Sequence, residues 1–322
     1  MGLDKTLVVV EANGSRVLPA SLELLTQART LAAAVEAVTW GDAAELAAEV
    51  GEYGASRIFH VGDVDGGLPG PATAASIAAI VESGASPDAI LVPQTYDGRD
   101  VAARLSVRLD KPVITNVIGM EGEGDGLRSV HGVFGGTKVV KAAFTGGKPW
   151  IFVVKAKSFA AEPSGGAPAE VVTAAHPDLG LTAAAKIIDR HVEESTGPKL
   201  DEADVVVAGG RGLGSKEAYG MVEELARLLG GAPGASRAIV DADWVPYSYQ
   251  VGQTGKTVKP TVYVALGISG ATQHLVGMKG AKNIIAVNKD KEAPIFSVAD
   301  LGIVGDVHQV LPKLIEALKA RR

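Results

Sequence analysis

Residues 247–274 read YSYQVGQTGKTVKPTVYVALGISGATQH, and the rest of the chain is organised around them. A polar, glycine-rich segment from Gln250 to Thr257 is followed by an apolar run from Thr261 to Leu266. A second glycine turn, Gly267 to Gly270, then leads towards His274. A buried strand between two loops rich in backbone N–H groups is how many proteins approach a phosphorylated cofactor. We therefore expect a cofactor site around this strand.

The C-terminal part of the chain places strand–turn–helix patterns on both sides of this stretch. Asp204–Ala208 reads as a buried strand, GGRGLG at 209–214 as a turn, and Lys216–Leu229 as a helix that Ser215 can cap. Further apolar runs predict three strands and a closing helix, at Ala238–Val240, Asn283–Val287, Pro294–Ser297 and Val307–Leu318. This alternation predicts a doubly wound, Rossmann-like α/β domain, which we expect to span residues 196–322.

The N-terminal part alternates in the same way but carries an addition. The pattern predicts strands at Leu7–Val10, Arg57–Val61 and Ala89–Pro93, and helices at Ser21–Val38, Asp42–Tyr53, Thr73–Ser83 and Asp97–Leu109. This order predicts a parallel sheet covered by helices. Between residues 113 and 159, close strands joined by glycine turns predict antiparallel hairpins added to that sheet. AEPSGGAPAE at 161–170 reads as a linker, and we expect this α/β domain to span residues 1–195.

Composition excludes several classes of function. The 322 residues carry a net charge of −6 and no basic stretch that could neutralise a phosphate backbone, so no nucleic-acid partner is expected. Without cysteine, the chain can form no disulfide and no iron–sulfur cluster. The six histidines lie far apart, with no HxH or HExxH pair, so no metal site is expected. The first apolar run is too short for a signal peptide, which makes the cytoplasm the expected location.

Two glycine loops resemble nucleotide-binding patterns, but their spacing departs from those patterns. Counted from Gly210, GGRGLGS carries Ser215 where the dinucleotide pattern GxGxxG needs its last glycine. Arg211 in that turn either binds a pyrophosphate through two parallel hydrogen bonds or is simply solvated. GKT at 255–257 resembles the end of a P-loop, but Gln250 stands where that pattern needs its first glycine. We therefore reject an ATP-hydrolysing P-loop.

No arrangement of residues specifies acid–base or nucleophilic catalysis. His274 either caps a helix, is satisfied in the core, or faces a ligand beside the glycine turn that precedes it. ISG at 268–270 is not a nucleophile elbow, because Ala271 stands where the G-x-S-x-G pattern needs its second glycine. We therefore assign no catalytic residue.

The stretch VYVALGISGATQHLVGMKGAKNIIAVN, residues 262–288, resembles the alpha subunit of electron transfer flavoprotein. The shared signature is an apolar strand followed by GISG at 267–270, QH at 273–274, Gly277 and AVN at 286–288. The segments GGRGLGS, ASRAIVDADW, YQVGQTGKTVKP and NKDKEAPIFSVADLGIVGD resemble family segments in the same order. One departure is Thr272, where the family usually has isoleucine or valine.

The resemblance implies a redox carrier without a substrate-turnover site of its own. It implies one FAD, held mainly by the C-terminal domain, in a heterodimer with a smaller beta subunit that carries AMP. It implies electron uptake from dehydrogenases, typically acyl-CoA dehydrogenases of fatty acid beta-oxidation. Delivery would be to the membrane-bound electron transfer flavoprotein–quinone oxidoreductase.

The resemblance also assigns residues to parts of the FAD. Arg211 and Ser236 would hold the phosphates, and Asn288 and Asp306 the adenosine end, with Val307 completing the set. The ribityl–phosphate region would be held by Ser269, Gly270, Ala271, Thr272, Gln273 and His274. The flavin ring would be lined by Val251, Gly252, Gln253 and Thr254, with Arg237 against it and His274 near its O2 edge. Because reduction places negative charge near N1 and O2, a cation there would raise the potential.

Two other classes stay open from the residues alone. A nicotinamide-dependent oxidoreductase on a doubly wound domain should show a GxGxxG turn or a placed catalytic histidine, and neither is clear. A non-redox nucleotide-binding protein would leave QVGQTGKT and ISGATQH unexplained. An absorption spectrum of the purified protein separates these classes from a flavoprotein.

Overall fold

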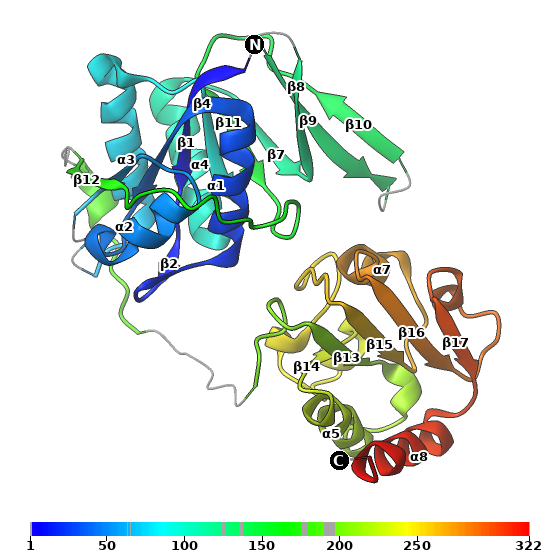
Figure 1. The fold of residues 1–322 in the computed structure, drawn as a ribbon. Helices are drawn as coiled ribbons and strands as arrows, with labels where there is room; N and C mark the ends of the chain where they lie inside the picture. Colours follow the sequence, from blue (N-terminus) through cyan, green and yellow to red (C-terminus); the bar gives the residue numbers. More distant parts are fainter. Residues whose placement is uncertain are drawn as a thin grey trace. The chain divides into compact units, whose positions relative to one another are not determined.

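A computed structural model describes residues 2–62, 64, 66–123, 126–134, 138–174, 179–189 and 197–321 (Figure 1). The chain divides into two compact units, each described here by itself. Unit 1 is Met1–Val133 with Thr137–His191, and unit 2 is Val192–Arg322 with Phe134–Gly136. The boundary predicted between residues 195 and 196 lies outside the described residues, so its exact position stays a prediction.

Unit 1 is built on a seven-stranded parallel sheet in the order β12-β5-β4-β1-β6-β11-β7. Its strands are β1 (Leu3–Val9), β4 (Ala32–Thr39), β5 (Arg57–His60), β6 (Ala89–Pro93), β7 (Val113–Val117), β11 (Trp150–Val154) and β12 (Glu170–Thr173). The helices are α1 (Pro19–Leu31), α2 (Ala43–Glu52), α3 (Pro69–Ile80) and α4 (Tyr96–Leu109). Helices α1 and α2 share one core with the sheet, while α3 and α4 share the other. Because strand side chains alternate, Val8 enters the first core and Leu7 the second.

Strand β4 was not predicted. The pattern predicts one helix from Ser21 to Val38, but α1 ends at Leu31 and β4 begins at Ala32. The strand AAAVEAVT opens with three alanines, which are strong helix formers and carry no period-two signal. Pairing with both β1 and β5 overrides that local preference.

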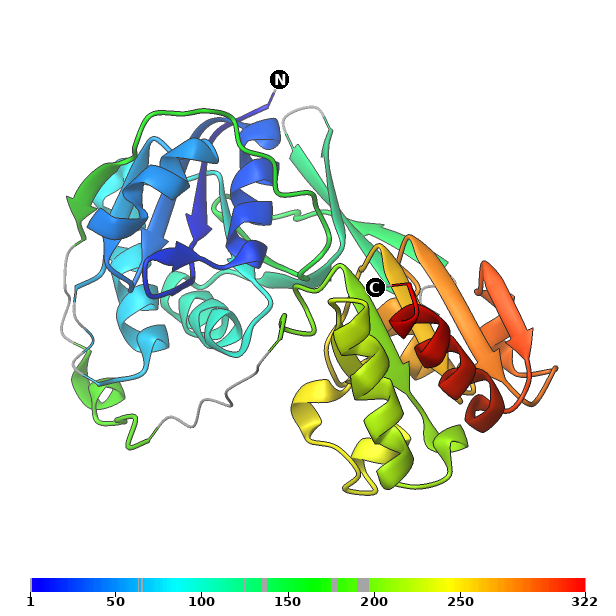
Figure 2. The same ribbon diagram turned by 60° about the horizontal axis from the view of Figure 1, so that its bottom comes forward.

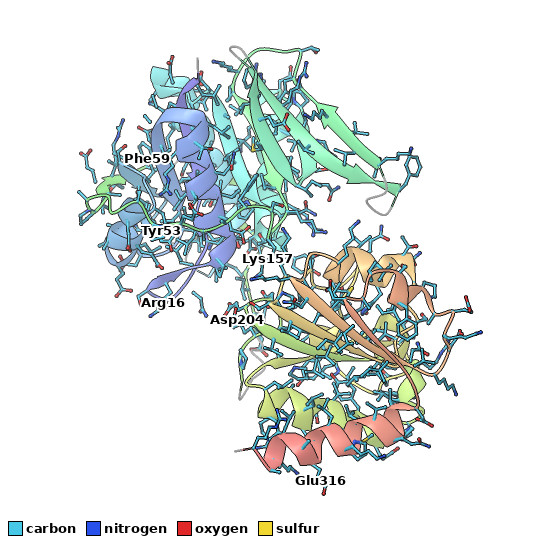
Figure 3. All side chains as sticks on the ribbon, turned by 45° about the vertical axis from the view of Figure 1, so that its right-hand side comes forward. Arg16, Tyr53, Phe59, Lys157, Asp204 and Glu316 are labelled. Carbon is cyan, nitrogen blue, oxygen red and sulfur yellow. The ribbon has the colours of Figure 1, made fainter. Side chains whose placement is uncertain are left out.

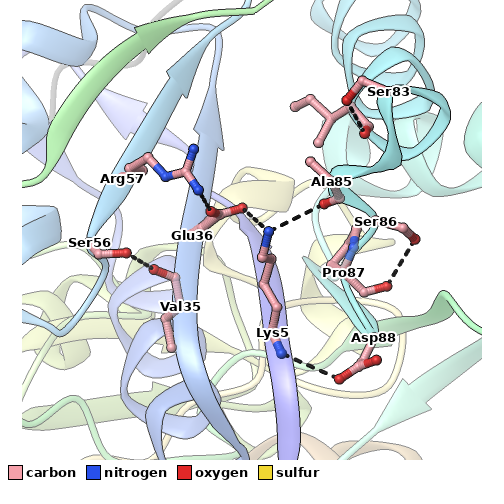
Figure 4. Close-up of polar contacts among 11 residues, drawn as sticks. Lys5, Val35, Glu36, Ser56, Arg57, Ser83, Ala85, Ser86, Pro87 and Asp88 are labelled. Carbon is pink, nitrogen blue, oxygen red and sulfur yellow. Dashed lines mark hydrogen bonds and ion pairs between the residues drawn. The ribbon is translucent and has the colours of Figure 1, made fainter.

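A buried carboxylate ties three neighbouring strands of the sheet together (Figure 4). The side chain of Glu36 on β4 is only 3% exposed. Its Oε2 lies 3.6 Å from Lys5 Nζ on β1, and its Oε1 lies 2.5 Å from Arg57 Nη2 on β5. Lys5 Nζ also donates to the Ala85 carbonyl at 3.4 Å. The two cations therefore compensate a charge that would be costly to bury alone.

The predicted antiparallel addition is present, but as a sheet of its own. Strands β8 (Gly119–Glu123), β9 (Gly126–Val133) and β10 (Lys138–Ala142) pair antiparallel in the order β10-β9-β8. The flanking strands β7 and β11 instead join the parallel sheet. A two-residue ladder, β2 (Ala12–Asn13) with β3 (Arg16–Val17), follows β1.

The segment read as a linker packs against α2. Ser164 N–H donates to the Glu52 carbonyl at 2.7 Å, and Ala169 N–H donates to the Ala47 carbonyl at 2.9 Å. A Cβ added at Gly51 would lie 2.1 Å from the Ala167 carbonyl oxygen. The linker interpretation is therefore wrong for 164–169, because a proline- and glycine-rich chain can also pack closely along a helix and feed a strand, here β12.

Unit 2 is a five-stranded parallel sheet in the order β14-β13-β15-β16-β17. Its strands are β13 (Val205–Gly209), β14 (Ala232–Ala235), β15 (Val262–Leu266), β16 (Asn283–Asn288) and β17 (Leu301–Val304). Its helices are α5 (Gly220–Leu228), α6 (Arg237–Val240), α7 (Thr272–Met278) and α8 (Val307–Lys319). The doubly wound α/β fold predicted for this part of the chain is confirmed.

Helices cover both faces of this sheet. On one face α5 and α8 lie side by side (Figure 2), and Leu225, Leu311 and Ile315 enter the core there. Glu316, the residue after Ile315, points away from the sheet (Figure 3). On the other face α7 contributes Met278 to a second core. Within the described ranges, no helix is long and apolar enough to cross a membrane.

Two strands of unit 2 were predicted at the wrong places. Ala238–Val240 belongs to α6, and the strand is β14, Ala232–Ala235, before it. Pro294–Ser297 is a short 3₁₀ helix, and the strand is β17, Leu301–Val304, after it. The sequence of β14 is APGA, which has no β-branched residue, so pairing with β13 rather than propensity makes it a strand.

Candidate functional site

The topology of unit 2 places a crevice between two neighbouring strands. From β13 the chain passes to β14 on one side, and β15, β16 and β17 then follow on the other side. The loops after β13 and β15 therefore leave in opposite directions at the carboxyl edge of the sheet. In open α/β sheets, ligands bind at this switch point. A cavity of about 850 Å³ lies there.

The cavity gathers residues from five separate segments of unit 2. Of the sequence-predicted residues, those that line it are Arg211, Ser236, Arg237, Val251, Gly252, Gln253, Thr254, Ser269, Ala271, Gln273, His274 and Asn288. Those that do not line it are Gly270, Thr272, Asp306 and Val307. The further lining residues, to which the sequence had assigned no contact with a cofactor, are Gly212, Ala238, Asp241, Gln250, Gly267, Ile268, Lys289, Asp290, Ala293 and Pro294.

The predicted residues outside the lining have clear structural positions. Gly270 has φ +84°, and a Cβ there would lie 2.2 Å from the Ile295 nitrogen. Thr272 is exposed at the start of α7. Asp306 caps α8 by accepting from the His308 N–H at 2.9 Å, and Val307 is the buried first residue of that helix. Their contact with a cofactor stays a prediction.

Two glycine turns contact each other at the base of the cavity. Gly212 N–H donates to the Gly267 carbonyl at 2.9 Å. A Cβ added at Gly212 would lie 2.7 Å from Gly267 Cα, and Gly267 itself has φ +63°. Only glycine allows backbones this close. The contact fixes the turn that carries Arg211 beside the turn that carries Ser269.

Hydrogen bonds hold the loop from Gln250 to Thr257 in place. Gln250 is buried, and its Nε2 donates to Thr254 Oγ1 at 2.9 Å. Tyr247 Oη donates to the Thr254 carbonyl. Gln253 N–H donates to the Gln273 carbonyl at 2.8 Å, which docks the loop on α7. Because Thr254 Oγ1 accepts from Gln250, its own hydrogen is directed elsewhere. The sequence signal for this Gln250–Thr254 bond is a glutamine that stands four residues before a threonine in a glycine-rich loop.

His274 is a buried histidine with one nitrogen engaged. Its Nε2 lies 3.0 Å from Tyr263 Oη on β15. Its Nδ1 is buried without a hydrogen-bond partner among the described residues. Burial lowers the pKa of His274 to about 4, and a contact with the Val251 backbone that lies outside normal hydrogen-bond geometry opposes part of that shift. The imidazole on the cavity wall is therefore neutral at physiological pH.

The charged groups along the cavity are of both signs. Arg237 Nε lies 3.0 Å from Asp241 Oδ2, one helical turn away, and both side chains are largely exposed. Arg211, Lys289 and Asp290 complete the charged lining. Three cations face two carboxylates, which suits an anionic ligand.

A doubly wound sheet with a glycine-walled cavity at its switch point defines a nucleotide-cofactor-binding α/β protein. Residues 199–279 match the family described as "Electron transfer flavoprotein FAD-binding domain". Residues 6–179 match the family described as "Electron transfer flavoprotein domain".

Curated relatives match almost the full length of the chain. "Electron transfer flavoprotein subunit alpha" of Mycobacterium tuberculosis (strain ATCC 25618 / H37Rv) is 44% identical over 322 residues, covering 99% of each chain. The protein of the same name from Mycobacterium leprae (strain TN) is 42% identical over 328 residues, again covering 99% of each. That from Syntrophomonas wolfei subsp. wolfei is 38% identical over 322 residues, covering 98% of this chain and 99% of the relative.

The chain belongs to the electron transfer flavoprotein alpha-subunit family. Its role is that of an electron-transfer flavoprotein, and unit 2 contains its FAD-binding domain. The resemblance drawn from residues 262–288 is confirmed.

Proposed function

We propose that the switch-point cavity of unit 2 holds one FAD, and that the chain works in a heterodimer with a beta subunit. The cavity itself carries this proposal, because its volume of about 850 Å³ suits a large cofactor and its wall carries both cationic and hydrogen-bonding side chains. The fit also rests on His274, whose buried Nδ1 makes no hydrogen bond of normal geometry with the described residues.

The phosphates of the cofactor would lie at the two glycine turns that meet through Gly212 and Gly267. Arg211 offers a planar guanidinium that can bind a pyrophosphate through two parallel hydrogen bonds. Ser236 and Ser269 add hydroxyl groups, and the turn before α7 adds backbone N–H groups. The adenosine end would lie towards Asn288, whose Nδ2 already donates to the Ile268 carbonyl at 3.0 Å, and towards Asp306 and Val307.

The flavin ring of the cofactor would lie against the loop from Gln250 to Thr257. Val251, Gly252, Gln253 and Thr254 line the cavity there. The Thr254 oxygen accepts a hydrogen bond from Gln250, so the Thr254 hydroxyl hydrogen can be donated to a ligand. Arg237 brings a positive charge, and His274 a neutral donor or acceptor. Bound FAD would supply the electron-accepting ring, while these side chains would tune how strongly it holds electrons.

The family role also implies electron donors and an electron acceptor for this chain. Electrons would come from dehydrogenases, typically acyl-CoA dehydrogenases, and pass to the membrane electron transfer flavoprotein–quinone oxidoreductase. AMP would be bound only by the beta subunit. The chain would act as a carrier without turning over a substrate, and the cytoplasm stays its predicted location.

Co-expression with a candidate beta subunit, followed by purification and an absorption spectrum, tests the proposal. A flavin spectrum that is lost in Arg211→Ala and kept in Arg227→Ala is expected, because Arg227 lies exposed on α5, away from the cavity lining. A colourless, stable heterodimer would contradict the proposal and reopen the nicotinamide and non-redox alternatives.

A further inference from the structure

A buried hydrogen bond joins the cavity-lining His274 to Tyr263, which lies behind the lining. Tyr263 is the second residue of β15 and is completely buried in the sheet. His274 is the third residue of α7. The two rings meet edge to face, with centroids 6.2 Å apart and planes at 60°, and Tyr263 Oη lies 3.0 Å from His274 Nε2.

The direction of this hydrogen bond can be assigned by counting donors and acceptors. Burial raises the pKa of the Tyr263 phenol, so its oxygen keeps its hydrogen. Nε2 of His274 is the one hydrogen-bond partner of that hydroxyl among the described residues. A buried O–H left without an acceptor is unfavourable, so the phenol donates and Nε2 accepts.

The tautomer of His274 follows from that direction. A neutral imidazole carries one hydrogen, and Nε2 cannot carry it while accepting from Tyr263. The hydrogen therefore sits on Nδ1. This nitrogen is buried, has no partner of hydrogen-bond geometry in the described residues, and belongs to a side chain that lines the cavity.

The surroundings also favour the neutral ring. Burial is the main cause of the lowered pKa of His274, and the opposing influence is a contact with the Val251 backbone that lies outside normal hydrogen-bond geometry. Along the same cavity the charged side chains are Arg211, Arg237, Asp241, Lys289 and Asp290, and none of them contributes to that shift. A charged imidazolium would make Nε2 a donor and leave the Tyr263 hydrogen without an acceptor.

We propose that Tyr263 is a positioning residue that holds His274 as the neutral Nδ1–H tautomer, so that the cavity receives an uncharged hydrogen-bond donor. Only the identity of the acceptor rests on the proposed function. If the cavity holds FAD as proposed, the acceptor is a carbonyl oxygen of the flavin ring. Tyr263 would then determine which hydrogen bond the flavin ring receives from His274, without touching the flavin itself.

The tautomer is tested in the full chain labelled with 15N-histidine. Long-range correlation spectra read the protonation of both ring nitrogens, and His274→Gln assigns the signals among the six histidines. We expect protonated Nδ1 and unprotonated Nε2 at every pH from about 6 to about 8. A wild-type Nε2–H tautomer, or an imidazolium in that range, would overturn the proposal, whatever the Tyr263 variant does.

Tyr263→Phe keeps the ring and removes only the donor. His274 should then shift from one tautomer to a mixture. The matched control is Tyr219→Phe, because Tyr219 is also buried and donates to the Gly234 carbonyl at 2.9 Å, outside the cavity lining. Both variants lose one buried hydroxyl, but only the first should change His274. An unchanged tautomer in Tyr263→Phe would refute the role of Tyr263.

The bound cofactor gives the second measurement. In the heterodimer, Tyr263→Phe should lower the flavin midpoint potential while Tyr219→Phe leaves it unchanged. A heterodimer without flavin would contradict the proposed function and leave the tautomer result standing. A flavin-loaded heterodimer whose potential does not respond to Tyr263→Phe would refute the donor's contact with the ring.

Discussion

Gly277 on α7 and Gly252 in the loop before β15 lie backbone to backbone. A Cβ added at Gly277 would lie 2.4 Å from the Gly252 nitrogen and 2.5 Å from its Cα. Gly252 has φ +145°, a conformation that other residues rarely adopt. The loop that lines one end of the cavity therefore depends on the absence of a methyl group on the opposing helix.

Gly277→Ala should push this loop away from α7. An inserted methylene in a packed contact costs typically 1–3 kcal/mol, so we expect a loss of stability of about 2 kcal/mol and weaker FAD retention. Thermal unfolding and the ratio of flavin to protein absorbance measure both effects. Gly220→Ala is the control, since a Cβ there meets nothing within 4 Å. Equal behaviour of the two variants would contradict the role of the contact.

The Arg237–Asp241 pair should set the electrostatics at the ring end of the cavity. Arg237→Ala removes a positive charge, so the flavin midpoint potential should fall while FAD stays bound. Asp241→Asn removes the opposing charge at 3.0 Å and should raise the potential. Because both side chains are exposed and screened, we expect shifts no larger than about 60 mV, which is tenfold in a one-electron equilibrium.

Spectroelectrochemical titration of the two variants and of Arg227→Ala decides this point. Opposite shifts for Arg237→Ala and Asp241→Asn, with none for Arg227→Ala, are expected. Shifts of the same sign in the first two would mean that conformation rather than charge controls the ring.

The glycine turns and Arg211 could be predicted because a motif fixes them locally. GISG and GGRG specify close backbone approach, and the structure brings the two turns into contact through Gly212 and Gly267. The doubly wound topology then places them at one edge of the sheet. Local sequence and topology agree here, and the cavity lies beside the strand around which the sequence predicts a cofactor site.

Other features depend on pairing that no local pattern shows. The alanine-rich strand β4 and the APGA strand β14 are strands because neighbouring strands complete their hydrogen bonds. Tyr263 reads as one more apolar strand residue, and nothing in its neighbours indicates the bond to His274 eleven positions later. Gln250 was considered only as a missing P-loop glycine, although it braces Thr254.

Glu36→Gln should destabilise unit 1 without affecting the cavity. The substitution leaves Lys5 and Arg57 facing an uncharged amide in a buried position, and breaking a buried pair costs about 3–5 kcal/mol. Because Lys5 is 24% and Arg57 39% exposed, and because the isosteric amide keeps some hydrogen bonds, we expect a loss below that range but above about 1 kcal/mol. Chemical denaturation measures it. The control, Glu121→Gln, breaks an exposed pair with Lys141 and should cost less than about 1 kcal/mol.

Glu11 should make stability depend on pH. It follows β1, is buried, and its Oε1 accepts from Thr95 Oγ1 at 2.5 Å. Burial raises the pKa of Glu11 from 4.5 to about 7, opposed by Thr95 and reinforced by Asp97. Between these two pH values the folded chain binds more protons than the unfolded chain, so stability falls as pH rises.

The loss levels off above pH 7, where both states are ionised. One pKa unit is worth 1.36 kcal/mol, so the total is on the order of 3 kcal/mol between pH 4.5 and pH 7. Glu11→Gln should flatten this part of the curve of unfolding free energy against pH. Glu45→Gln, an exposed change on α2, should leave it as in the wild type. A slope that survives in Glu11→Gln would assign the pH dependence to another group.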